Sequence, residues 1–95
     1  MMMSRWYLFV VYLSDVPAKI QSRYFRKMKG YKKVERRGEV PREYIDGGML
    51  REYNVKWLGN GCFMIELEEE KIKEIYNEIG EVGVNCEVFL CEKVG

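Results

Sequence analysis

An unbroken apolar run near the N-terminus constrains the fold more than any other feature of this sequence. Residues 6–13 read Trp-Tyr-Leu-Phe-Val-Val-Tyr-Leu, eight apolar or aromatic residues in a row after Arg5. Aromatic and β-branched side chains favour a strand, and a run without polar alternation is typical of a strand covered on both faces. The following Ser-Asp-Val-Pro stretch, 14–17, is expected to end it. We therefore expect the central strand of one sheet here, with Leu8–Tyr12 in its middle.

Length and composition predict one small globular domain, 1–95. The chain has 95 residues, too few for a second core, and its 47% apolar share excludes a disordered chain. Charged residues reach 33%, nearly all Lys, Arg and Glu, which is the composition of heat-adapted proteins. Three cysteines without a secretory leader indicate a reducing, cytoplasmic setting, and the apolar run is too short to span a membrane.

Hydrophobic spacing predicts the remaining elements. Residues 16–29 have helical periodicity after a cap at Ser14 or Asp15, and Ile72, Ile75 and Ile79 mark a second helix that ends at Gly80 or Gly83. Residues 31–37 are expected to form a charged edge strand, and alternation predicts a last strand from Val84 to Leu90. Two alternating runs, 53–57 and 63–67, flank an Asn-Gly turn and predict a hairpin.

The order strand, helix, strand, hairpin, helix, strand predicts an α+β two-layer sandwich of the ferredoxin-like kind. Its two helices would cover one face of a mainly antiparallel sheet, with Ile20, Tyr24, Ile72, Ile75 and Ile79 in the core. Residues 38–52 would form an irregular insertion. Within it, Pro41 could begin a helical turn, or 42–45 could be a strand arm.

No set of residues predicts a catalytic, metal or cofactor site. The chain lacks histidine, so no base is available to activate Ser14. Cys86 and Cys91 are five positions apart on a predicted strand, which places them on opposite faces and too far apart to share a metal or a disulfide. We expect three separate thiols and an interaction module rather than an enzyme.

Two short stretches resemble known families. The strand Val10-Val11-Tyr12, followed by Asp15, loosely resembles the Cas2 family of metal-dependent nucleases. In that family, a dimer brings together aspartates that follow the first strand. In this chain Leu13 directly follows the strand, and helix capping is the alternative role of Asp15. The run 8–13 also resembles the first strand motif of the RNA-recognition motif, which would make Phe9 a base-stacking residue. In the partner motif, Cys62 and Met64 stand where stacking aromatics would be.

The clearest functional signal is a charge asymmetry. Residues 19–42 contain ten Lys or Arg against two Glu, a net charge of +8, whereas 66–95 contain nine Glu against three Lys, a net charge of −6. A basic helix face with interleaved aromatics suits phosphate contact and base stacking, so RNA or DNA is the leading partner. The alternatives are a salt-bridged surface and a homo-oligomer that joins basic to acidic regions. The candidate nucleic-acid-binding residues are Lys19, Arg23, Arg26, Lys27, Lys32, Arg36, Tyr24 and Tyr31.

Overall fold

The computed structural model describes residues 3–38 and 40–92 as two helices and six strands. Their order is β1 (Arg5–Tyr12), α1 (Ala18–Lys29), β2 (Tyr31–Arg37), β3 (Val40–Asp46), β4 (Asn54–Gly59), β5 (Cys62–Leu67), α2 (Glu69–Val82) and β6 (Asn85–Cys91). Among these residues, no helix is long and apolar enough to cross a membrane.

Four strands form the main sheet in the order β4-β5-β1-β6, with every neighbouring pair antiparallel. The apolar run of β1 therefore lies between two strands, as its sequence predicts. The β4–β5 hairpin closes where Gly59 pairs with Cys62, so Asn60 and Gly61 form the expected two-residue turn. The expected α+β class with a mainly antiparallel sheet is confirmed.

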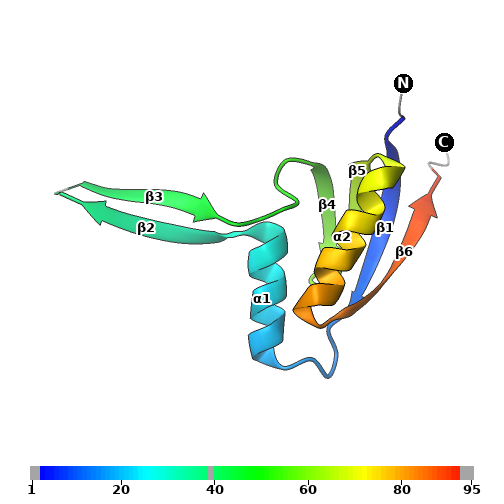
Figure 1. The fold of residues 1–95 in the computed structure, drawn as a ribbon, viewed down its shortest axis with the longest axis horizontal. Helices are drawn as coiled ribbons and strands as arrows, with labels where there is room; N and C mark the ends of the chain where they lie inside the picture. The colour runs from blue at the N-terminus through cyan, green and yellow to red at the C-terminus, as the bar shows by residue number, and fades with distance from the viewer. Residues whose placement is uncertain (1–2, 39, 93–95) are drawn as a thin grey trace.

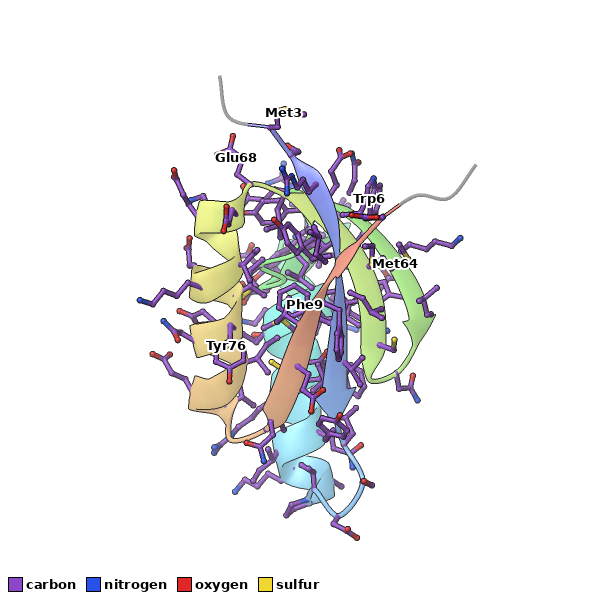
Figure 2. The ribbon with its side chains drawn as sticks, turned by 90° about the vertical axis from the view of Figure 1, so that its right-hand side faces the viewer. Met3, Trp6, Phe9, Met64, Glu68 and Tyr76 are labelled. Atoms are coloured by element: carbon purple, nitrogen blue, oxygen red, sulfur yellow. The ribbon has the colours of Figure 1, made fainter. Side chains whose placement is uncertain are left out.

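Among the described residues, only one face of this sheet is covered, which corrects the expectation that β1 is buried on both sides. Tyr7, Phe9 and Val11 of β1 point into a core that also contains alternate residues of β5. Tyr24 and Met28 of α1 and Ile75 and Ile79 of α2 close this core from the same side. Figure 2 shows Trp6 and Met64 on the other side of the sheet, away from α2.

The strands β2 and β3 do not join the main sheet. They pair only with each other and extend away from the rest of the molecule as an arm (Figure 1). We call residues 31–46 the arm. The expectation of an irregular insertion near 38–52 was therefore wrong for 40–46, where the strand alternative was correct. Gly38, at φ 73°, makes the tight reversal possible.

The first helix begins two residues later than its periodicity predicts. Pro17 is the N-cap residue, and its carbonyl accepts the amides of Ile20 and Gln21, so the expected cap at Ser14 or Asp15 was wrong. Asp15 instead adopts a left-handed turn conformation at φ 64°. The second helix ends at Gly83, one of the two glycines expected there.

Candidate nucleic-acid interface

The exposed side of α1 carries a stripe of positive charge. Lys19, Arg23 and Arg26 follow the spacing i, i+4, i+7, which places them on one side of the helix, and all three are exposed. The sequence of α1 contains no acidic residue. We call these three residues the α1 stripe, and their placement agrees with the expectation from the sequence.

Lys27, four positions after Arg23, borders the stripe on the side that faces α2, and its ammonium group is already paired. Its ammonium group forms ion pairs with Glu78 and, at 3.6 Å, with Glu81, which joins α1 to α2. The hydrogen bond with Glu78 is the main cause that raises the pKa of Lys27. Because two carboxylates already neutralise this ammonium group, the structure separates Lys27 from the α1 stripe.

Tyr24 cannot take the stacking role expected for it. Its side chain is 0% exposed and lies in the core, where its ring contacts Phe25 edge-on at 5.1 Å. Burial is the main cause that raises the pKa of its hydroxyl, which has no hydrogen-bond partner among the described residues. The helical periodicity correctly predicted a core position for Tyr24. The prediction that Tyr24 is a nucleic-acid-binding residue was wrong.

The arm presents basic side chains on both of its faces. Residues that pair directly across an antiparallel ribbon share a face, so Lys32, Val34 and Arg36 lie on one face together with Glu43 and Ile45. The other face carries Tyr31, Lys33 and Glu35 with Arg42 and Tyr44. Lys32, Lys33, Arg36 and Arg42 are exposed. The arm is thus a two-stranded ribbon with charge along its length and apolar groups, such as Val34 at 54% exposure, between the charges.

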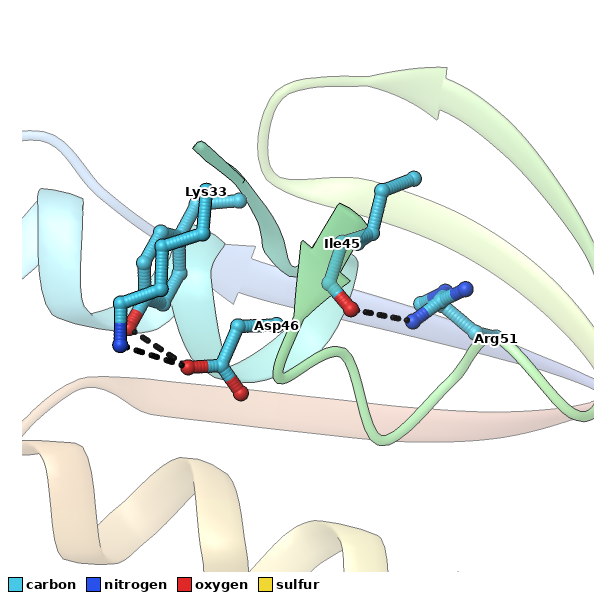
Figure 3. Close-up of polar contacts among 5 residues, drawn as sticks. Lys33, Ile45, Asp46 and Arg51 are labelled. Atoms are coloured by element: carbon cyan, nitrogen blue, oxygen red, sulfur yellow. Dashed lines mark hydrogen bonds and ion pairs between the residues drawn. The ribbon is translucent and has the colours of Figure 1, made fainter. Parts of the chain in front are cut away.

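A polar cluster fixes the base of the arm (Figure 3), and one of its residues, Tyr31, also contacts the α1 stripe. The Tyr31 hydroxyl donates to Asp46 Oδ2 at 3.0 Å, and Lys33 Nζ donates to the same oxygen at 3.3 Å. These contacts, led by the Tyr31 hydroxyl, lower the pKa of the Asp46 carboxyl. The Arg26 guanidinium lies 5.2 Å from the Tyr31 ring centre, so stripe and arm meet at this residue.

Backbone contacts hold the arm against the end of α1. The amides of Met49 and Leu50 donate to the carbonyls of Lys27 and Met28, which belong to the last turn of α1. Arg51 Nη1 donates to the Ile45 carbonyl at 3.2 Å (Figure 3). A side chain at Gly47 would lie 2.9 Å from the Arg26 carbonyl, so only glycine fits this close approach. The arm therefore leaves the body from an anchored base.

Four basic residues that were not among the site residues predicted from the sequence also belong to this region. Lys33 and Arg42 lie on the arm, and Lys29 lies 4.2 Å from the Trp57 ring centre and 5.2 Å from that of Phe25. Arg51, as described above, bonds to the arm. Lys29 and Trp57 are far apart in the sequence, so no local pattern predicted their contact. The pairing of 31–37 with 40–46 was the information needed to recognise Lys33 and Arg42.

The other sequence-derived candidates lie apart from this interface. Phe9 is 0% exposed and stacks on Phe63 at 5.0 Å inside the core, so the stacking role implied by the RNA-recognition motif was wrong. Asp15 is exposed in the loop after β1.

Within residues 3–38 and 40–92, no three Cys, Asp or Glu side chains gather closely enough to hold a metal ion. The three cysteines are free, with Cys86 paired across to Val11 and Cys91 to Trp6, hence on opposite faces as expected.

No family model, no curated protein and no solved structure matches this chain.

Proposed function

We propose that this protein binds nucleic acid, with the arm as the element that enters a groove and the α1 stripe as the element that contacts the phosphate backbone. The observation that carries the proposal is the arm itself, a projecting ribbon with exposed Lys32, Arg36 and Arg42 and an anchored base. A two-stranded ribbon buried on neither face contributes little to folding stability, so its size and charge call for another explanation.

The dimensions of the arm favour duplex DNA. Seven residues in each strand give a ribbon about 24 Å long, with strands about 4.8 Å apart. The major groove of B-form DNA is about 12 Å wide and admits such a ribbon, whereas the major groove of duplex RNA is too narrow and deep. We therefore propose that duplex DNA is bound more tightly than duplex RNA.

The charge distribution supports one orientation of the protein on DNA. The exposed residues of α2 include Glu69, Glu70, Glu74 and Glu81, which repel phosphates. Exposed Lys and Arg side chains cluster on the α1 stripe and the arm, whereas the exposed Lys71 and Lys73 of α2 lie among these glutamates. Since Lys27 pairs with α2 and Lys33 pairs with Asp46, the proposed phosphate-contact set is Lys19, Arg23, Arg26, Lys32 and Arg36.

The sharpest test shortens the arm without changing the charge of the protein. Residues 34–43 contain three arginines and three glutamates, so their removal leaves the net charge unchanged. Lys33 pairs directly with Tyr44, and an Asn-Gly turn between them would close the shortened ribbon as Asn60-Gly61 closes β4 and β5. The Tyr31–Asp46 contact at the base would remain.

We expect the full chain to bind duplex DNA at 50 mM salt and the shortened chain to bind at least about tenfold more weakly. Fluorescence anisotropy with duplex DNA, duplex RNA and single-stranded DNA of equal length measures this. Circular dichroism confirms that both chains are folded. Equal affinity of the two chains would refute the role of the arm, and absence of binding at low salt would refute the proposal as a whole. Magnesium-dependent cleavage that Asp15→Asn abolishes would instead favour the Cas2-like nuclease.

We further propose that the body is ferredoxin-like and that the arm is an insertion between α1 and β4. Without β2 and β3, the chain order is strand, helix, strand, strand, helix, strand. The strand order β4-β5-β1-β6 and its antiparallel pairing support this assignment.

A further inference from the structure

The face of the main sheet opposite the helices has no role in the proposed function. We call it the open face. Its centre is apolar, with Trp6, Leu8 and Val10 of β1 next to Met64 of β5, all only partly buried. Phe89 on β6 extends the patch and is 47% exposed. A contiguous apolar surface of this kind in a small protein indicates a binding surface.

Charge excludes nucleic acid as the partner of this face. Its charged residues on the described strands are Lys56 on β4, Glu66 on β5 and Glu87 on β6, a net negative set. Single-stranded nucleic acid needs a positive groove beside its stacking aromatics, and anionic lipid needs positive charge as well. An apolar centre with a polar border is instead the usual anatomy of a protein interface.

The arrangement of these residues is self-complementary. Strand register places Lys56, Met64, Leu8 and Phe89 in one row across the sheet, and Cys62, Val10 and Glu87 in the next. Lys56 thus lies on one edge strand and Glu87 on the opposite edge strand. A two-fold axis parallel to the strands places β4 of one copy over β6 of the other. Each Lys56 then lies near Glu87 of the other copy, which gives two such pairs in the dimer.

A two-fold axis across the strands would have the opposite effect. It would place β4 over β4 and β6 over β6, so that Lys56 faced Lys56 and Glu87 faced Glu87. Like charges across an interface are unfavourable. In the first arrangement β5 also lies over β1, so that Met64 of one copy packs on Leu8 of the other. Both the charges and the apolar centre therefore select the axis parallel to the strands.

We propose that two copies of this chain form a dimer through their open faces, related by a two-fold axis parallel to the strands. The four strands give a face about 19 Å wide. This face offers fewer residues than the 20–30 on each side of a standard interface, so we expect a dissociation constant in the micromolar range. Neither the arm nor the α1 stripe belongs to the open face, so this proposal does not depend on the proposed function.

The first experiment measures mass against concentration by analytical ultracentrifugation without nucleic acid. We expect the mass to rise from 11.3 kDa toward twice that value as the concentration passes through the micromolar range. Met64→Glu on the open face should keep the monomer mass, and Val34→Glu on the arm, a matched control, should dimerise like the unaltered chain. A monomer at every concentration up to 1 mM would overturn the proposal, as would unaltered dimerisation of Met64→Glu.

The second experiment tests the orientation with exposed residues on the two edge strands, and circular dichroism confirms that each variant is folded. Lys56→Glu and Glu87→Lys should each weaken dimerisation at least about tenfold, because each creates two like-charge contacts. The double variant Lys56→Glu/Glu87→Lys restores opposite charges and should dimerise within about threefold of the unaltered chain. Lys73→Glu on α2 is the control and should have no effect. Failure of the double variant to recover would overturn the proposed axis.

Discussion

The salt dependence of DNA binding gives the most quantitative test of the proposed interface. Each phosphate neutralised by a protein cation contributes about −0.9 to the slope of log K against log salt. If Lys19, Arg23, Arg26, Lys32 and Arg36 each contact one phosphate, the slope is about −4.5. Affinity for duplex DNA should then fall about 500-fold between 50 mM and 200 mM salt.

Removal of two charges from the α1 stripe should change this slope by a defined amount. Lys19→Gln/Arg23→Gln leaves three contacts, a slope of about −2.7 and a loss of about 40-fold over the same range. The double variant Lys27→Gln/Lys71→Gln is the matched control, since it also removes two positive charges but from ion pairs with Glu78 and Glu74.

The control should keep the slope near −4.5, because neither ammonium group is assigned to a phosphate. Its effect on folding should be small, since Lys27 and Glu78 retain 31% and 35% exposure and such pairs contribute about 0.5 kcal/mol. Anisotropy titrations at four salt concentrations measure both slopes. If the two double variants lower the slope equally, binding follows net charge rather than this interface, and our assignment of the α1 stripe is refuted.

Three further predictions concern the core, the base of the arm and a thiol. Tyr24→Phe should stabilise the fold by about 1 kcal/mol in urea denaturation, because it removes a buried hydroxyl with no hydrogen-bond partner among the described residues; a loss of stability would show that a partner exists. The pKa of Asp46 is lowered by Tyr31 and Lys33, so its contact is complete above the unfolded pKa of about 4 and is lost as the pH falls through the lower folded pKa. Backbone amide NMR shifts of the arm should report this acid transition, and Asp46→Asn should abolish it. Burial raises the pKa of Cys86 to about 11, so in a Cys62→Ser/Cys91→Ser chain its alkylation rate should still rise about tenfold per pH unit at pH 9; a plateau there would contradict the burial of this thiol.

Elements with strong local patterns were predictable from the sequence. The Asn60-Gly61 turn between alternating runs and the isoleucine stripe of α2 depend on neighbouring residues, and both lie where the sequence placed them. The position of β1 inside the sheet followed from its apolar run. The exposure of the other face of β1 could not be predicted in this way. A strand with apolar residues on both sides has the same sequence pattern whether its second side packs against a helix or contacts another molecule.

The features that were missed depend on contacts between distant residues. No local sequence pattern distinguishes pairing of 31–37 with the main sheet from pairing with 40–46. The arm was therefore predicted as an edge strand and an irregular insertion. In the same way, Lys27 and Arg26 are equivalent in the sequence of α1, and only the position of Glu78 on α2 separates them. The heat-adapted and cytoplasmic setting suggested by composition stays a prediction.

The free edges of the arm have a consequence for the solubility of this protein. Each strand of the ribbon has one edge without a neighbouring strand, and the amides and carbonyls there can pair with another chain. Val34 and Val40 at its surface are 54% and 74% exposed. Charged side chains and proline are the usual protection against such edge-to-edge aggregation, and Lys32 and Pro41 occupy these positions here. Lys32, which we assign to the proposed DNA contact, thus also protects the arm from aggregation, and arm variants that remove it should be handled at low protein concentration.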